Sequence, residues 1–322
     1  MTKTSSALDL IRFLCCPYDS GELDVSLSNA RSQDFTFNGH LSCQTCHRQF
    51  PVHEGIISIM PDDFAVNTSV EAGLKRTEQR VRDSQANVYL QWFGPYTNGI
   101  EFDALSEELD PRHDDVVVDL GCGVGRYSIL LSKKVQFLIA IDYSFESLKL
   151  LRNSCLKEGS NNILIIQADV TKLPLLSSSF NKIVSNQVLT LLPGEDARNQ
   201  GCAEIFRILA KEGRYVGTVF NNGIFRKWNR MLGKSGAFRK EGYHPIHKFY
   251  YYNFSSKDIS EMFSRANLKS HSIRGICNFP RERVKDLPIE GWSGILYRID
   301  VAISRTPLSL ITGDLLMITA NK

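Results

Sequence analysis

Short apolar runs recur along the middle of this 322-residue chain, and a polar or amphipathic stretch follows each of them. Such runs are typical of parallel strands that are buried on both faces of a sheet, whereas the stretches between them predict helices and loops. Near the end, 255–268 predicts a helix and 270–279 a further strand. The pattern therefore predicts an open α/β sheet, with its first five strands at 116–120, 137–141, 163–166, 180–185 and 213–220.

The first predicted strand leads directly into a glycine-rich turn and the start of a helix. The turn reads Asp119-Leu-Gly121-Cys-Gly123-Val-Gly125-Arg126. In open α/β sheets this turn holds nucleotide-like ligands, and glycine permits both positive φ and close approach of the backbone. Arg126 stands where dinucleotide-binding turns have a further glycine, and Asp119 would repel a diphosphate but attract an ammonium or a sulfonium group. The turn therefore favours S-adenosylmethionine as the ligand of Asp119, Gly121 and Gly123.

Acidic residues also stand at the ends of the next two predicted strands. Asp142 follows 137–141, where a carboxylate can accept hydrogen bonds from both ribose hydroxyls. Tyr143 is placed to cover one face of the adenine, and Asp169, after the third strand, to accept from the adenine amino group. Packing alone does not explain three acids at three successive strand ends. We therefore expect Asp119, Asp142 and Asp169 to face one ligand.

With these motifs, residues 112–222 resemble the core of class I S-adenosylmethionine-dependent methyltransferases. The motifs that carry the resemblance are the turn at 119–125, Asp142, Gln167-Ala-Asp169-Val170, Ser179-Phe180-Asn181 and Arg207-Ile-Leu-Ala-Lys-Glu-Gly213. The resemblance implies an enzyme with a Rossmann-like seven-stranded methyltransferase sheet, in a domain over 112–322 that an antiparallel strand at 313–322 completes. It also implies that Cys122, Val170 and Gln187 join the residues above in binding the cofactor.

Two positions depart from that family. Asn181 stands where an aspartate is frequent, and the segment 187–193 lacks a histidine pair that often follows the fourth strand. The second departure removes a common candidate for a general base. The catalytic residues therefore stay open, with His244, His247 and nearby tyrosines as alternatives, while His244 beside a proline also suits a simple turn.

Residues 1–62 carry four cysteines with the spacing of a zinc ribbon. One pair is Cys15 and Cys16, and the other is Cys43 and Cys46. The module resembles the short zinc ribbon that acts as an activator subunit of tRNA and protein methyltransferases and that also occurs fused to bacterial methyltransferases. The predicted zinc ligands are Cys16, Asp19, Cys43 and Cys46, although Asp19 replaces the usual cysteine. Cys15 and His47 are alternative ligands, a metal-free ribbon is the other interpretation, and the role is structural in either case.

Three further segments are candidates for covering the site. Residues 63–111 begin with a predicted connecting helix that is exposed and rich in charge pairs. An aromatic stretch follows, in which Tyr89, Trp92 and Phe93 either cover the cofactor or pack on the sheet. A second insertion at about 280–311 offers Trp292 and Tyr297 as pocket walls. The third segment, at about 221–253, predicts a lid in which one acid, Glu241, stands against Arg226, Lys227, Arg230, Lys234, Arg239, Lys240 and Lys248.

A basic lid interleaved with aromatic residues favours an acceptor that is anionic and partly flat or apolar. Such a lid would also suit RNA or an anionic membrane surface, and a solvated hairpin packed on the core is the structural alternative. The net charge of +3 and the pI of about 8.3 neither require nor exclude nucleic acid. The sequence shows no secretory signal and no apolar run long enough to span a bilayer, so we expect a soluble cytoplasmic protein without disulfides.

The leading hypothesis is a methyltransferase that acts on a small molecule, in specialised, lipid or quinone metabolism. The first alternative is an RNA nucleobase methyltransferase, because some of these enzymes combine an N-terminal zinc site with this core. A cofactor-binding scaffold without catalysis is the second alternative. The sequence leaves open the acceptor atom, the pathway and the oligomeric state.

Overall fold

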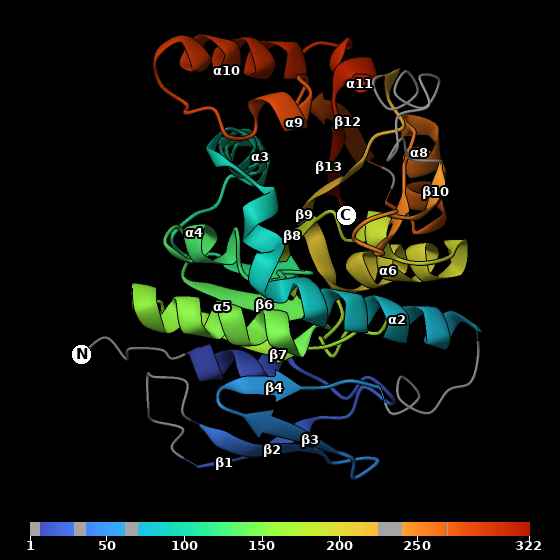
Figure 1. Ribbon diagram of the computed structural model, residues 1–322. Helices are drawn as coiled ribbons and strands as arrows, with labels where there is room; N and C mark the ends of the chain where they lie inside the picture. The colour runs from blue at the N-terminus through green and yellow to red at the C-terminus, as the bar shows by residue number, and fades with distance from the viewer. Residues whose placement is uncertain (1–6, 29–36, 62–69, 225–239, 269) are drawn as a thin grey trace.

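The computed structural model describes residues 7–28, 37–61, 70–224, 240–268 and 270–322, and one long twisted sheet runs through them (Figure 1). Its central part has the strand order β7-β6-β5-β8-β9-β13-β12. All neighbours are parallel except β13, which is antiparallel to both β9 and β12. The predicted strands are present as β5 (Val116–Leu120), β6 (Phe137–Asp142), β7 (Ile163–Gln167), β8 (Phe180–Asn186), β9 (Leu209–Phe220), β12 (Ser270–Ile276) and β13 (Leu315–Asn321).

The expectation of a seven-stranded sheet is wrong for the sheet as a whole, because the N-terminal module extends it to eleven strands. Strand β4 pairs in parallel with β7, with Ile56 opposite Ile165. Without this pairing β7 would be an open edge strand, and the buried Ile56 and Ile57 cover it with apolar side chains. The module contains η1 (Ala7–Phe13), β1 (Leu23–Ser28), β2 (Asn38–Cys43), β3 (Gln49–His53) and β4 (Ile56–Ser58).

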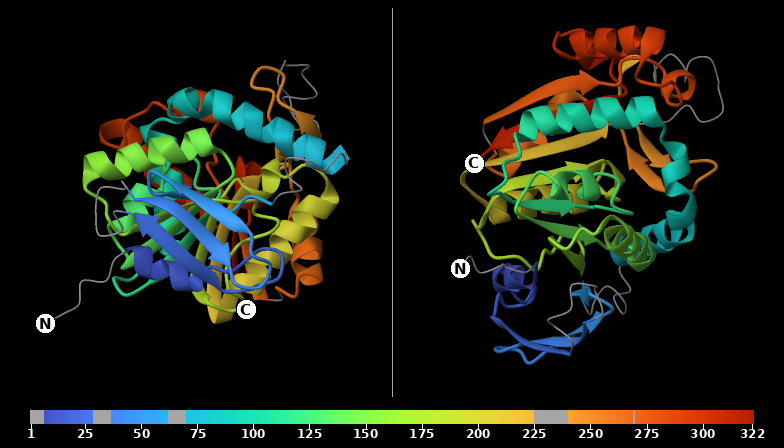
Figure 2. Two further views of the ribbon diagram at one scale, coloured as in Figure 1. Left: turned by 90° about the horizontal axis from the view of Figure 1, so that it is seen from below. Right: turned by 90° about the vertical axis from the view of Figure 1, so that its left-hand side faces the viewer.

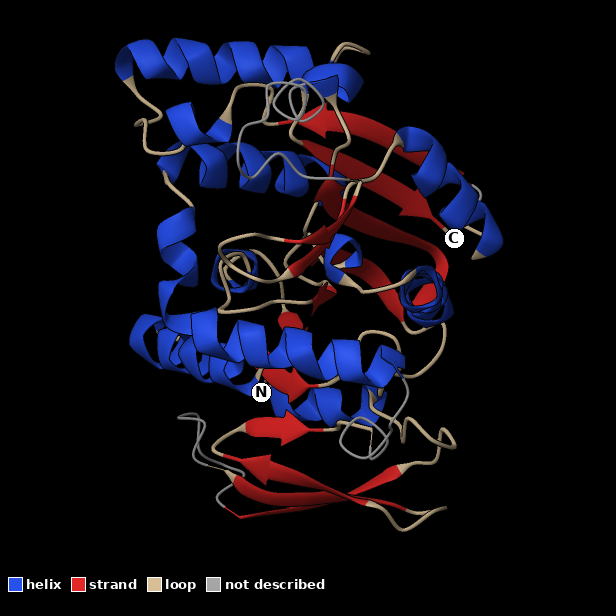
Figure 3. Cartoon of the chain, turned by 45° about the vertical axis from the view of Figure 1, so that its right-hand side comes forward, coloured by secondary structure: helices blue, strands red, loops and turns tan. Residues whose placement is uncertain are grey.

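Helices cover both faces of the central sheet, and α6 and α8 lie on the side opposite to α4 and α5 (Figure 1). Helix α2 runs across the front of the core, and α3 is seen along its axis in the same view (Figure 1). Two further views show the same helices from below and from the side (Figure 2). The helices before the fourth core strand are α2 (Val70–Gln85), η2 (Ala86–Trp92), α3 (Pro95–Leu109), α4 (Ser128–Ser132) and α5 (Phe145–Glu158). Those after it are η3 (Leu189–Leu191), α6 (Glu195–Ile208) and α8 (Ser256–Arg265). The secondary-structure colouring of Figure 3 shows the same layers.

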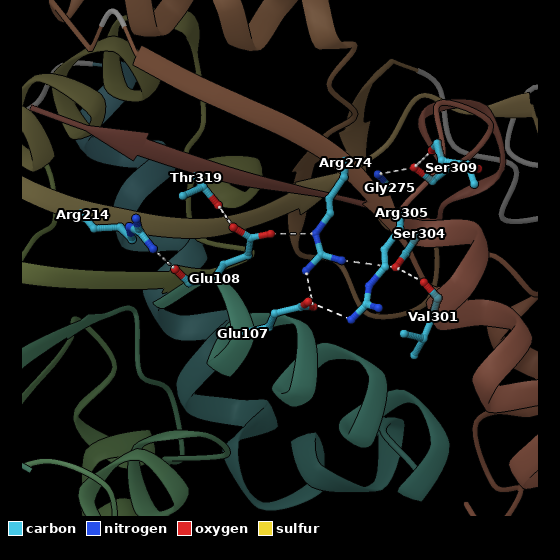
Figure 4. A network of polar contacts seen from close by, with 11 residues as sticks. Glu107, Glu108, Arg214, Arg274, Gly275, Val301, Ser304, Arg305, Ser309 and Thr319 are labelled. Carbon is cyan, nitrogen blue, oxygen red and sulfur yellow. Dashed lines mark hydrogen bonds and ion pairs between the residues drawn. The ribbon is translucent and has the colours of Figure 1, made fainter. Parts of the chain in front are cut away.

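The second insertion forms three helices that lie beyond the β12 edge (Figure 1): α9 (Arg281–Val284), α10 (Gly291–Ser304) and α11 (Ser309–Thr312). Ion pairs and hydrogen bonds join it to α3 and β12. Arg305 contacts Glu107 of α3 at 2.8 Å, and Arg274 of β12 donates to the Ser304 hydroxyl at 3.2 Å (Figure 4). Arg274 also contacts Glu107 at 3.2 Å and Glu108 at 3.0 Å, so the same network ties β12 to α3.

The predicted lid at 221–253 is only partly described. Its visible part is the hairpin of β10 (Glu241–Tyr243) and β11 (Tyr250–Tyr252). Five of its predicted cations lie outside the described residues, namely Arg226, Lys227, Arg230, Lys234 and Arg239. Within the described ranges, no helix combines the length and the apolar character that crossing a bilayer requires.

Candidate active site

The glycine turn between β5 and α4 borders a pocket of about 940 Å³ at the carboxyl ends of the core strands. Gly121 and Gly123 both line it and have φ of 67° and 55°. A Cβ added at Gly121 would lie 2.2 Å from the Val188 side chain, whereas one at Gly123 would meet no atom within 4 Å. Positive φ therefore requires glycine at 123, and both positive φ and close packing require it at 121.

Asp142, at the end of β6, lines the same pocket and holds the turn in place. Its Oδ2 accepts a hydrogen bond from the Gly123 backbone N–H at 2.9 Å, and its Oδ1 accepts from the Ser144 N–H at 2.8 Å. Burial raises the pKa of Asp142, and the two backbone donors oppose that rise. Both carboxylate oxygens of Asp142 thus accept from the backbone at the edge of the pocket, and its contact with a ribose stays a prediction.

Asp169, Val170 and Tyr143 complete the predicted residues that line this pocket. Asp169 is already engaged, because Lys75 of α2 places its Nζ 3.1 Å from Oδ2 and Thr171 donates to Oδ1 from its backbone N–H at 2.8 Å. Lys75 also donates to the Thr171 hydroxyl at 2.7 Å. An adenine amino group would therefore have to compete with Lys75 for Asp169.

Three predicted cofactor residues, Asp119, Cys122 and Gln187, do not line the first pocket as the described residues form it. Asp119 is buried behind the turn, where its Oδ2 accepts from the Ser128 hydroxyl at 2.7 Å. Burial raises its pKa to about 7, with Ser128 opposing the rise. Cys122 is buried, and burial raises the pKa of its thiol well above the usual value. The assignment of these residues to the cofactor stays a prediction.

Gln187 instead belongs to a second, adjoining pocket of about 500 Å³. Its φ of 58° is rare for a residue with a side chain, and its backbone N–H donates to the Thr218 carbonyl at 2.9 Å. Strained backbone of this kind clusters at ligand sites. The pocket shares three walls, Arg82, Tyr89 and Leu191, with the first, and its others are Trp92, Phe93, Gln187, Phe220, Phe249 and Arg281.

The aromatic segment lines the junction of the two pockets, and of its two predicted roles, a roof over the cofactor or packing on the sheet, this placement fits the first. Tyr89 lines both pockets, and Trp92 and Phe93 line the second. The Tyr89 ring lies 5.4 Å from Trp92 and 5.1 Å from Phe93, measured between centroids. The segment thus forms a continuous aromatic wall above the strand ends.

The other expected pocket residues lie elsewhere. Trp292 on α10 is 88% exposed, and Tyr297 donates from its hydroxyl to Asp103 at 2.5 Å. His244 lies in the turn of the β10–β11 hairpin, where its Nδ1 accepts from the His247 backbone N–H at 3.0 Å, so the turn interpretation of His244 fits. The His247 ring packs 4.3 Å from Trp92 without lining either pocket.

Residues of α2 are the part of the site that our sequence analysis missed. Four of them line the first pocket: Lys75, Glu78, Arg82 and Gln85. Their spacing of three, four and three residues places them on one face of a helix. That spacing was visible in the sequence, but a charged helix is more often a solvated one.

A buried ion network supports the second pocket from behind. Glu101 of α3 is fully buried and contacts Arg126 at 2.7 Å and Arg281 at 2.9 Å. The Arg126 guanidinium lies 3.8 Å from the centroid of the Phe93 ring, a cation–π contact. Arg126, which replaces the third glycine of dinucleotide-binding turns, therefore fixes the aromatic wall.

The four predicted metal ligands come together in the N-terminal module. Single ligand atoms of Cys16, Asp19, Cys43 and Cys46 lie within 4.8 Å of one another. The Cys16 and Cys46 sulfurs are 3.6 Å apart, and Cys43 Sγ lies 3.3 Å from Asp19 Oδ1. The backbone N–H of Gly21 lowers the pKa of Asp19 to about 2, which keeps it ionised. Three thiols and a carboxylate at this spacing suit a tetrahedral zinc ion.

Comparisons with known proteins agree with this geometry. Residues 117–213 match the methyltransferase domain family. The chain is 32% identical over 126 residues to an uncharacterized chloroplastic methyltransferase of Arabidopsis thaliana, At2g41040, in an alignment that covers 37% of this chain and 35% of that protein. The match thus spans about a third of the length of this curated relative.

Two solved structures share the fold at low sequence identity. Phosphoethanolamine N-methyltransferase 2 of Haemonchus contortus, in complex with phosphomonomethylethanolamine and S-adenosylhomocysteine, has a TM-score of 0.51 and 17% identity over 79% of this chain and 60% of that one. A chain from the complex of the Haloferax volcanii Trm112 methyltransferase activator with a methyltransferase has a TM-score of 0.50 and 16% identity, over 74% of this chain and 96% of that one.

The prediction of a methyltransferase is therefore confirmed at the level of the domain. The strand order, the glycine turn beside a pocket and the family match all fall on the same part of the chain. Residues 117–213 carry the match to the methyltransferase domain family, and the chain shares its fold with solved methyltransferases.

Proposed function

We propose that the whole protein transfers a methyl group from S-adenosylmethionine to a small-molecule acceptor. The observation that carries the proposal is the junction of the two pockets, which share Arg82, Tyr89 and Leu191. One pocket suits a nucleoside ligand, and the other is lined mainly by aromatic side chains. Two ligands bound in adjoining pockets would meet at the shared walls, and such proximity supplies much of the rate of a transfer reaction.

The residues of the first pocket fit the cofactor. Asp142 would accept from the ribose, the glycine turn leaves open space beside Gly123, and Tyr143 and Val170 would flank the adenine. When bound, S-adenosylmethionine supplies an activated methyl group on sulfur. The protein's own contribution is to hold both partners and to exclude water beneath the aromatic wall.

The N-terminal module has a structural role in this proposal. Its four ligands would hold zinc in a closed site without an open coordination position, so the ion would stabilise the fold and take no part in chemistry. Strand β4 then extends the catalytic sheet and covers the edge that β7 would otherwise expose.

The lining of the second pocket favours a small molecule over a folded RNA as the acceptor. Small-molecule sites are lined mainly by hydrophobic and aromatic side chains with a few polar groups, as this pocket is. An extruded nucleobase would also fit, so the test must offer both kinds of acceptor. Purified protein is incubated with methyl-labelled S-adenosylmethionine and with either total RNA or a small-molecule cell extract. Label in the small-molecule fraction is expected, whereas label in RNA alone would replace this proposal with the RNA alternative, and label in neither would favour the scaffold.

A binding measurement tests the cofactor site separately. Asp142→Ala should weaken binding of S-adenosylhomocysteine by about 1.5 to 3 kcal/mol, through loss of charge-assisted hydrogen bonds. Glu146→Ala, an exposed acid on α5, is the control. Unchanged affinity in the Asp142 variant, measured by titration calorimetry, would show that the ribose lies elsewhere.

A further inference from the structure

We infer that the acceptor carries an ionised oxygen, as a carboxylate or an acidic phenol or enol does, and that Arg82 and Gln187 bind this anion in the second pocket. The inference rests on the proposed function and names its substrate class. It follows from three properties of the second pocket: the polar atoms that have no partner, the flat apolar walls, and the kinds of titratable group that line it.

The first property is that the unpartnered polar atoms of this pocket are all donors. Gln187 is 6% exposed, and its Nε2 has no hydrogen-bond acceptor among the described residues. The same holds for Nε and Nη2 of Arg82, whose side chain is 13% exposed. Buried polar groups without partners cost stability and are rare in folded proteins. Three buried donors without acceptors therefore indicate a ligand that brings acceptor oxygens.

The Arg82 guanidinium is only partly engaged by its neighbours. It interacts with the Tyr143 hydroxyl and with the charges of Asp142 and Glu78, but its Nε and Nη2 have no hydrogen-bond acceptor among the described residues. Glu78 Oε2 is the nearest carboxylate oxygen, at 4.0 Å from Nη2, which is beyond hydrogen-bond distance. Glu78 uses its other oxygen to accept from the Tyr250 backbone N–H at 2.5 Å, and burial raises its pKa. The Phe249 ring lies 4.7 Å from the Arg82 guanidinium and positions it from the side. Arg82 is thus held in place by neighbours that leave two of its nitrogens, Nε and Nη2, free to donate to a ligand.

Arg281, the other cation that lines the second pocket, is already paired with carboxylates. It contacts Glu101 at 2.9 Å and Asp314 at 3.6 Å, so two carboxylates already balance it. Its guanidinium packs 5.4 Å from the Phe93 ring centroid. Arg281 therefore shapes the wall, and the anion is assigned to Arg82 and Gln187.

The second property is that the remaining walls are aromatic. Tyr89, Trp92 and Phe93 stand on one side, and Phe249 and Phe220 complete the enclosure. Aromatic rings prefer to pack against other flat π systems in tilted or offset arrangements. The anion that Arg82 binds is therefore part of a planar, mainly apolar molecule.

The third property concerns proton transfer. Among the described residues, no histidine and no carboxylate lines the second pocket, and Tyr89 supplies its one hydroxyl group. A neutral hydroxyl or ammonium acceptor needs a base within hydrogen-bond reach to take its proton. An acceptor that arrives ionised needs none. Its oxygen forms a bond to the methyl carbon as the carbon–sulfur bond breaks, and the electron pair of that bond stays on sulfur. No proton leaves. The anion and the sulfonium thus yield a neutral methyl ester or ether and S-adenosylhomocysteine.

The test compares two probes of nearly the same shape, trans-cinnamate and its neutral amide, which replaces one carboxylate oxygen with an NH2 donor. Binding of each is measured by titration calorimetry in the presence of saturating S-adenosylhomocysteine. We expect the wild-type protein to bind cinnamate about tenfold more tightly than cinnamamide. In Arg82→Met, which keeps the apolar stem, that preference should fall to about one, and Gln187→Met should reduce it in part. The control is Arg80→Met, because Arg80 lies on the same helix, is exposed and lines neither pocket.

The outcomes separate this inference from the proposed function. Equal affinity of the wild-type protein for both probes, or no binding of either up to millimolar concentration, would overturn the inference. A preference for cinnamate that survives in Arg82→Met would overturn the role of Arg82. Binding of S-adenosylhomocysteine is measured first in every variant, and its absence from the wild-type protein would refute the proposed function instead.

Discussion

The buried carboxyl group of Asp119 predicts a pH dependence of stability that Asp119→Asn should remove. Asp119 is 3% exposed, and burial raises its pKa from about 3.8 to about 7. Asp142 adds to the rise, whereas Ser128 and Arg126 oppose it. Asparagine keeps the shape of the side chain and an oxygen that can accept from the Ser128 hydroxyl, but it cannot ionise.

The sign follows from the raised pKa. Below about pH 4 the Asp119 carboxyl group is protonated in both the folded and the unfolded chain. Its contribution to the free energy of unfolding is then at its largest. As the pH rises, the unfolded chain ionises first, and the contribution falls by about 1.4 kcal/mol per pH unit until the folded group ionises near pH 7. Between pH 5 and pH 7 the free energy of unfolding of the wild-type protein should therefore fall by about 2 to 3 kcal/mol relative to that of Asp119→Asn. Above pH 7.5 it should fall little further.

Urea denaturation of both proteins at half-unit steps from pH 5 to pH 8.5 measures this difference. The buried asparagine amide adds an offset of its own, but that offset does not vary with pH, so the slope is the diagnostic quantity. Asp114→Asn, at an exposed position before the same strand, controls for the loss of one negative charge. A difference between Asp119→Asn and wild type that stays constant from pH 5 to pH 7 would mean that Asp119 is ionised in the folded protein, and the burial argument would fail.

Two further predictions concern the metal cluster and the adenine end of the pocket. Protein purified without added metal should contain about one zinc ion per chain by mass spectrometry. The Cys46→Ser variant should lose this zinc, whereas Cys155→Ala, outside the cluster, should keep it. A stoichiometry near zero in folded wild-type protein would contradict the zinc proposal. Lys75→Ala should strengthen binding of S-adenosylhomocysteine about fivefold, because the substitution frees Asp169 from an ion pair worth about 1 kcal/mol. Weaker binding in this variant would show that Lys75 contacts the ligand itself.

The core strands could be predicted from sequence because their apolar runs are continuous and local. Strand β6, for example, is buried at each of its six positions, and no other interpretation fits such a run so well. The pairing of β4 with β7 could not be predicted in the same way. It joins Ile56 to Ile165 across more than a hundred residues, and it depends on which strand is left at the edge of the sheet.

The site shows the same division between local and distant information. The glycine turn, Asp142 and Asp169 stand at strand ends, where the sequence itself indicates a ligand. Gln187 was expected at the cofactor, but its positive φ turns the residue into the second pocket. Arg82 gave no signal of its own, because its role depends on where α2 crosses the sheet. That position depends on the packing of α2 against α5 and η2, which cannot be read from the local sequence around Arg82.

The two pockets, taken with both proposals, differ in the polar groups that they present to a ligand. Asp142 and Asp169 place carboxyl groups in the first pocket, whereas Arg82 and Gln187 turn donors into the second. A cationic methyl donor and an anionic acceptor would thus each be attracted to the pocket of opposite character. Transfer of the methyl group cancels both ligand charges at once, so each product loses the attraction that brought its parent in. The arrangement therefore favours the substrates over the products, and Arg82, which lines both pockets, stands at the boundary between them.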